Sequence, residues 1–234
     1  MKDFYYNQLS LEVRDLVNEI EDFCKVEINI EIDENRTNAL ATEVTEMYAN
    51  ILIPKEDFFP EPSVFHELLH IKRFYVDKVP KIILCIDPGG YALEDEVNFI
   101  TLDNSIEHLS IVPEELHKYP ERAEYWEEIA ERQIEVTLDK KRLGDACINW
   151  IFICHVLNNA VLKDKAKIAL ERLKIIKDAN KFYEDVVANL GSKEKLTISH
   201  LNHFGLTLNG ICFEYIDIIN HELKGSEPFK SEYI

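Results

Sequence analysis

Residues 66–70 follow the pattern H-E-x-x-H, which constrains this chain more than any other stretch. In a helix, side chains four residues apart project from one face, so His66 and His70 can reach a single metal ion with Glu67 beside its open coordination position. The segment also has the apolar spacing of a helix, at Val64, Leu68, Ile71 and Tyr75. The pattern therefore predicts a helix with a buried face and a metal-binding edge, although the same spacing can form the polar edge of an ordinary core helix.

The residues before this motif predict one helix followed by three strands. Apolar residues recur at steps of three and four between residues 10 and 25, as in an amphipathic helix. Apolar and polar residues then alternate over residues 26–33, which predicts a strand with one wet face. Residues 39–44 and 48–53 predict two more strands, the second stopped by Pro54.

After the motif, the pattern predicts a short apolar segment, a turn and a second helix. Residues 81–86 fit a buried strand or the end of a helix, and residues 87–90 (Asp-Pro-Gly-Gly) indicate a turn. Apolar residues spaced through residues 93–109 favour a helix, and Pro113 disfavours its continuation.

The order of helix, strands and H-E-x-x-H helix resembles the zincin metallopeptidases, over about residues 51–113. That resemblance implies a zinc site at His66 and His70 and a role for Glu67 as the general base that takes a proton from the attacking water. It also implies a substrate that lies along an edge strand before the active-site helix. An ordinary α+β sheet is equally compatible with the strand pattern.

A catalytic zinc needs a third protein ligand. Gluzincins take it from a glutamate on a following helix, and Glu107 is the preferred candidate here. Asn104 and His108 share its helix and can hold its carboxylate. His108, or a tyrosine that the sequence does not identify, is the candidate donor to the oxyanion of the reaction.

Two earlier glutamates compete with Glu107. Residues 94–99 are similar to the E-x-x-A-N-x-F-A segment of the ImmA/IrrE regulatory metallopeptidases, with Val97 in place of the alanine, and so offer Glu94 or Glu96. At a rise of about 1.5 Å per residue, Glu94 and Glu107 would lie roughly 20 Å apart on one helix, so only one can bind the ion. Acidic residues in a first helical turn are expected from the helix dipole alone, which favours Glu107.

The remaining sequence is predominantly helical in pattern. Helices are predicted over residues 121–138, 146–157 and 161–190, the last ending at Gly191. The tail, with apolar stretches at residues 196–198, 206–208 and 211–219, predicts a further helix or two. His200 and His203 form an H-x-x-H pair that lacks an acidic or cysteine neighbour in sequence, and His155 lies in an apolar helix pattern typical of a hydrogen-bonded core histidine.

The composition excludes several classes of partner. With 44 acidic and 26 basic residues the formal net charge is −18, so nucleic acid and anionic membranes would be repelled. The sequence contains no run of about 18 apolar residues and no secretory h-region, so a cytoplasmic protein is expected. The cysteines form no C-x-x-C pair and are expected to be reduced core residues, at Cys24, Cys85, Cys147, Cys154 and Cys212.

The expected fold class is α+β, with a small zincin-like core of sheet and helices over residues 1–119 and a mainly helical C-terminal region over residues 120–234 packed on it. The expected function is an intracellular zinc metallopeptidase that hydrolyses a protein or peptide substrate. The alternative is an interaction protein that keeps a metallopeptidase-like core without proteolytic activity.

Overall fold

Helices make up most of the chain outside two small sheets, which confirms the α+β fold class, with an N-terminal sheet and a mainly helical C-terminal half. The computed structural model describes residues 3–84, 93–140, 143–204, 211–220 and 222–225, and the side chains of 84, 93–99, 140, 204 and 211 are not described. The described residues form two compact units. The first contains the chain up to residue 81 together with 214–225, whereas the sequence expectation ran the first domain to residue 119.

The first unit is built on a three-stranded sheet. Strands β1 (Ile28–Ile32), β2 (Ala41–Val44) and β3 (Ala49–Ile53) have the order β1-β3-β2, with β1 parallel and β2 antiparallel to the central β3. Ile28 and Ile30 are buried, as the alternating pattern of the first strand predicts. All three strands lie where the sequence placed them, and β2 is an edge strand.

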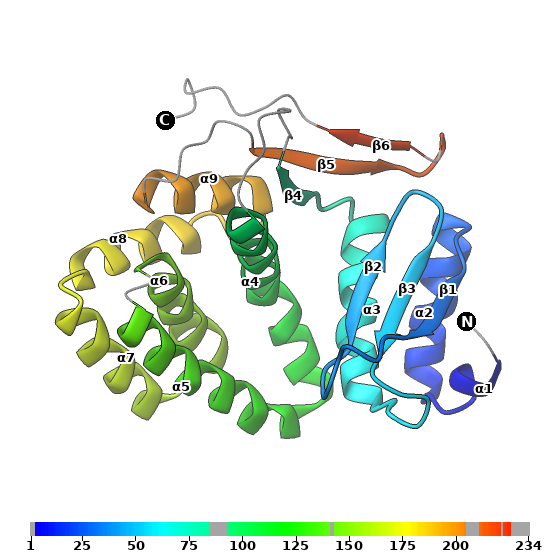
Figure 1. The fold of residues 1–234 in the computed structure, drawn as a ribbon, viewed down its shortest axis with the longest axis horizontal. Helices are drawn as coiled ribbons and strands as arrows, with labels where there is room; N and C mark the ends of the chain where they lie inside the picture. Colours follow the sequence, from blue (N-terminus) through cyan, green and yellow to red (C-terminus); the bar gives the residue numbers. More distant parts are fainter. Residues whose placement is uncertain (1–2, 85–92, 141–142, 205–210, 221, 226–234) are drawn as a thin grey trace. The chain divides into compact units, whose positions relative to one another are not determined.

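Helices α1 (Asp3–Tyr6), α2 (Leu11–Cys24) and α3 (Glu61–Tyr75) complete this unit. Helix α2 packs against α3, and α3 packs against β2 and β3, so α2 and α3 cover one face of the sheet (Figure 1). Helix α2 ends at Lys25, which takes the left-handed conformation at φ 57°. The two expected helices of this region are confirmed.

The turn between β2 and β3 is held to the C-terminal end of α3. The hydroxyl of Tyr75 lies 2.5 Å from the backbone oxygen of Thr45 and 2.8 Å from that of Tyr48. The ammonium group of Lys81 donates a hydrogen bond of 2.8 Å to the backbone oxygen of Val44. These contacts fix the edge strand β2 relative to α3, which carries the H-E-x-x-H motif.

A second three-stranded sheet has the order β4-β5-β6, with β4 at Lys81–Leu84, β5 at Ile211–Asp217 and β6 at Glu222–Gly225. The strand alternative for residues 81–86 is therefore correct over its described part, and the turn expected at residues 87–90 lies outside the described residues. The expectation of one or two helices in the tail is confirmed by α9 (Lys193–Phe204), but it is wrong for the apolar run at residues 211–219, of which 211–217 form β5. A short apolar run in a sequence does not distinguish a strand from a helix. The segment forms a strand because it pairs antiparallel with β6.

The second unit is mainly helical. Its elements are α4 (Leu93–Lys118), the 3₁₀-helix η1 (Pro120–Arg122), α5 (Ala123–Lys140), α6 (Leu143–Ile151), the π-helix η2 (Phe152–Leu157), α7 (Ala160–Arg172), α8 (Ile176–Val187) and α9 (Lys193–Phe204). Helices α5, α6 and α7 pack against one another, and α9 packs against α4 and α8 (Figure 1).

Two helix boundaries differ from the sequence expectation. Helix α4 continues through Pro113 to Lys118, because Pro113 is exposed and the buried residues Val112 and Glu115 on either side hold the helix in the core. The helix expected over residues 161–190 is two helices. Lys174 breaks it, since its φ of 62° is left-handed and incompatible with a continuous α-helix.

The cysteines differ in state. Cys24, Cys147 and Cys154 are free, as expected, whereas the expectation of a reduced thiol is wrong for Cys212, which is disulfide-bonded. In the part of the chain that the structure describes, no helix is both long and apolar enough to span a membrane.

Candidate metal centre

Helix α3 begins and ends where the sequence dictates. Pro60 is its N-cap residue, and Pro62 is tolerated in the first turn because the missing N–H has no helical partner there. Glu61 in the first turn and Lys72 and Arg73 in the last turn complement the helix dipole. A stable helix over the motif follows from these local signals.

His66 and His70 project from one edge of α3. Their ring centroids lie 4.9 Å apart, with the rings nearly perpendicular at 76°. His66 is 6% exposed and His70 is half-buried, while Leu68 and Leu69 are fully in the core, as the helical pattern predicts. The i, i+4 geometry expected of two histidine ligands is therefore present.

Glu67 lies next to this pair and is fixed by a threonine of the edge strand. The hydroxyl of Thr42 donates a hydrogen bond of 2.5 Å to Oε2 of Glu67. Glu67 is only 8% exposed, and a buried carboxylate needs such a donor to offset its loss of solvation. The motif glutamate is thus held between α3 and β2.

His108 on α4 is held by an aromatic neighbour of the second unit. Its ring packs edge-on against Trp126, with centroids 5.0 Å apart. The indole N–H of Trp126 donates to Oε2 of Glu115 at 3.0 Å, and Nε of Arg122 donates to Oε1 of the same carboxylate at 2.7 Å. Glu115 is fully buried, so these bonds set the position of the Trp126 ring against which His108 rests.

His66, His70 and His108 form a group that can hold a metal ion. Each offers one ring nitrogen, and the three nitrogens lie within 4.8 Å of one another. Donors around a tetrahedral zinc at about 2.05 Å lie roughly 3.3 Å apart, a separation below that 4.8 Å limit. Neutral imidazole is a good ligand for zinc and also for copper, iron and nickel.

Glu107, the preferred third ligand from the sequence, is engaged elsewhere. Its Oε1 lies 3.0 Å from Nζ of Lys193, which also lies 2.6 Å from Oδ1 of Asp103. Lys193 and Glu107 are both buried, and burial raises the pKa of Asp103 despite the opposing effect of the Lys193 ammonium group. The carboxylate of Glu107 thus belongs to a buried charge cluster of α4 and α9.

The remaining residues that the sequence suggested for the site, or for the core beside it, lie in different surroundings. Asn104 is exposed to solvent, whereas Glu107 is buried in the core. The backbone of Glu94 and Glu96 lies in α4, but their side chains lie outside the described residues. His155 is exposed on the π-helix η2, so the expectation of a core histidine is wrong.

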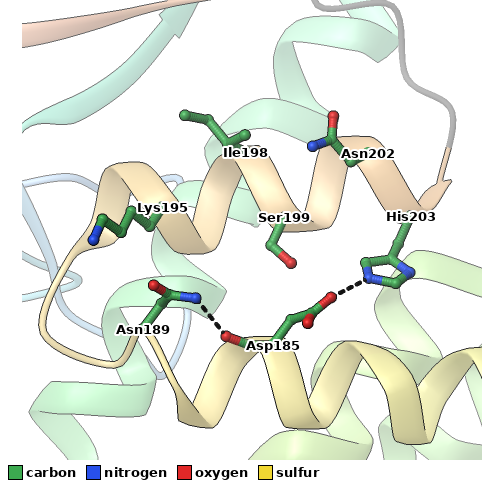
Figure 2. Close-up of a pocket in the computed structure, with 7 residues that line it drawn as sticks. All are labelled: Asp185, Asn189, Lys195, Ile198, Ser199, Asn202 and His203. Atoms are coloured by element: carbon green, nitrogen blue, oxygen red, sulfur yellow. Dashed lines mark hydrogen bonds and ion pairs between the residues drawn. The ribbon is translucent and has the colours of Figure 1, made fainter. Parts of the chain in front are cut away.

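Both rings of the H-x-x-H pair on α9 lie against Phe182, but they differ in burial and in partners. His200 is buried and its ring packs on Phe182, and burial lowers its pKa to about 4. His203 bonds through Nε2 to Oδ2 of Asp185 at 2.7 Å, at a cavity of about 280 Å³ between α8 and α9. Figure 2 shows this cavity, whose other lining residues are Asn189, Lys195, Ile198, Ser199 and Asn202.

Sequence reasoning missed the residues that support the site. Asp103 and Glu107 are four apart on α4, a spacing that indicates a shared face, but nothing in the sequence couples them to Lys193. Thr42 and Glu67 are brought together only by the packing of β2 on α3. Trp126 carries a recognisable signal, because a buried indole N–H requires an acceptor.

Comparison of the chain with protein-family models, with curated proteins and with solved structures found no match in any of the three.

Proposed function

We propose that the chain is a zinc-dependent peptidase in which His66, His70 and His108 bind the metal and Glu67 is the general base. The observation that supports this most directly is the approach of three histidine nitrogens to within 4.8 Å of one another. Three neutral imidazoles are a donor set of known catalytic zinc sites, which use three protein ligands and leave a fourth position open. Glu67 follows His66 directly in the chain and provides the carboxylate that such a site needs.

Zinc at this site would act as a Lewis acid and lower the pKa of a bound water to about 7. Glu67 takes the proton of the attacking water, whose oxygen bonds to the carbonyl carbon of the peptide. The carbon–nitrogen bond then breaks, and Glu67 returns the proton to the leaving amine. One carboxylate thus serves first as base and then as acid, and no other proton carrier is needed.

This assignment replaces Glu107 with His108 as the third ligand. Oε1 of Glu107 is held by Lys193, and moving this carboxylate toward a metal would weaken the pairing of a buried ammonium group. The ring of His108 packs on Trp126, with centroids 5.0 Å apart, and one of its nitrogens already lies within 4.8 Å of nitrogens of His66 and His70. The sequence-based roles of Glu107 as ligand and His108 as oxyanion donor stay predictions that a metal-binding assay separates.

The test is zinc affinity by competition with a coloured chelator, measured on purified variants. His66→Ala and His108→Ala should each lower the affinity at least 10-fold, because each removes one of three ligands. His117→Ala is the matched control, since His117 is an exposed histidine in the last turn of α4. Glu107→Gln should leave the affinity unchanged, and a loss of zinc in that variant with full affinity in His108→Ala would restore Glu107 as the ligand.

Hydrolysis is tested separately with a library of internally quenched peptides of randomised sequence. Glu67→Gln should keep the metal and the fold but lose cleavage, because an amide cannot accept the proton of the attacking water. A chain that binds zinc and cleaves no peptide would support the alternative of a metal-containing interaction module. The expected cytoplasmic location stays a prediction. Cys212 is disulfide-bonded, and disulfides are rare in reducing compartments. Measuring whether Cys212 is oxidised or reduced in cells therefore tests the location.

A further inference from the structure

Thr42 on the edge strand β2 contacts the motif glutamate, Glu67. Its backbone pairs with Ile51 in the antiparallel ladder of β2 and β3. Its hydroxyl lies 2.5 Å from Oε2 of Glu67 and 3.4 Å from the backbone oxygen of the same residue. A hydroxyl has one proton, and the shorter contact to the charged acceptor is the stronger one, so Thr42 donates to the carboxylate.

The carboxylate of Glu67 has a single hydrogen-bond donor among the described residues, and that donor is Thr42. Because Glu67 is 8% exposed, solvent contributes little to holding its side chain in one conformation. The bond engages Oε2 and leaves Oε1 to take the proton of the attacking water. The donor itself is well placed, because Tyr75 and Lys81 fix the strand end that follows Thr42.

We propose that Thr42 is a positioning residue for the general base. This inference rests on the proposed function, since it requires Glu67 to be that base. Thr42 acts through Glu67 alone, by restricting its carboxylate to the conformation in which Oε1 receives the proton. An unrestrained glutamate samples other rotamers and is correctly placed for a smaller fraction of the time, which lowers kcat and leaves substrate binding unchanged.

The experiment compares three variants of the full zinc-loaded chain on the library of quenched peptides. Thr42→Val keeps the shape of the side chain but removes the donor, and we expect kcat to fall roughly 10-fold to 100-fold with KM and zinc content unchanged. Thr42→Ser restores the hydroxyl and should return kcat to within about 3-fold of the wild type. A role in packing alone predicts the opposite order, because Val replaces the volume of Thr better than Ser does.

Thr45→Val is the matched control, since the Thr45 hydroxyl accepts hydrogen bonds from the backbone N–H groups of Met47 and Tyr48 in the turn after β2. It should reduce stability and leave kcat unchanged. Full kcat in a folded Thr42→Val, or an equal loss in Thr42→Ser, would overturn the role of Thr42 while leaving the proposed function intact. Undiminished cleavage in Glu67→Gln, or no cleavage by the wild type, overturns the proposed function and this inference together.

Discussion

The ammonium nitrogen of Lys193 lies 3.0 Å from Oε1 of Glu107, and both side chains are buried in the second unit. Asp103 completes the cluster at 2.6 Å from the same nitrogen and also accepts a hydrogen bond from the backbone N–H of Ile82. One cation therefore neutralises part of the charge of two carboxylates on α4. The cluster links α9 to α4, the helix that carries His108.

Replacing Lys193 should be among the most destabilising changes in the chain. Lys193→Met leaves the carboxylates of Asp103 and Glu107 without their counter-charge, and removing one partner of a buried ion pair typically costs about 3–5 kcal/mol in the free energy of unfolding. Urea denaturation measures the effect. Lys195→Met, an exposed lysine on the same helix, should change the free energy of unfolding by less than about 0.5 kcal/mol, and similar losses in both variants would contradict the buried role of Lys193.

The buried His200 predicts a loss of stability in mild acid. Burial lowers its pKa to about 4 in the folded chain, with His203 as a second cause, against about 6.5 in the unfolded chain. The folded state thus favours the neutral ring, so this contribution is complete above about pH 6.5 and is lost as the pH falls toward about 4. We expect His200 to account for a loss of about 2 kcal/mol between about pH 7.5 and about pH 5.

His200→Gln isolates this effect, because glutamine does not titrate and its free energy of unfolding should fall less over the same pH range. His117→Gln removes an exposed histidine and should keep the pH dependence of the wild type. Equal pH dependence in the wild type and in His200→Gln would show that His200 is not the group responsible.

Local patterns predicted much of the first unit and the histidine edge of the candidate metal site. The apolar spacing of α3 and the alternation of β1 are set by short-range sequence, and both elements lie where expected. The strand β5 and the partnership of Lys193 with Glu107 depend on pairing between distant segments, which no local pattern encodes. The same holds for Thr42, whose bond to Glu67 exists only because β2 packs on α3.

The break between α7 and α8 gives a test of backbone conformation. Lys174 adopts φ 62°, a left-handed conformation that costs a residue with a side chain roughly 1 kcal/mol relative to glycine. We expect Lys174→Gly to raise the free energy of unfolding by up to about 1 kcal/mol in thermal or urea denaturation. Lys181→Gly, in the middle of α8, should lower it by about 1 kcal/mol, and a loss of stability in Lys174→Gly would contradict the strained backbone.

The ring of Trp126 should control how well His108 binds metal. The indole is fixed by Glu115 and packs 5.0 Å from the His108 ring, so it limits the orientations that the imidazole can take. Trp126→Leu removes that surface, and we expect zinc affinity to fall roughly 10-fold in chelator competition, the lower end of the effect of residues that orient metal ligands. Trp126→Phe keeps an aromatic edge but loses the bond to Glu115, so its zinc affinity should lie between those of the wild type and Trp126→Leu.

Tyr125→Leu is the control, because it changes the neighbouring, exposed ring and should leave zinc affinity unchanged. Circular dichroism of each variant separates loss of fold from loss of ligand orientation, and unaltered zinc affinity in a folded Trp126→Leu would mean that His108 is positioned by other contacts or does not bind the metal.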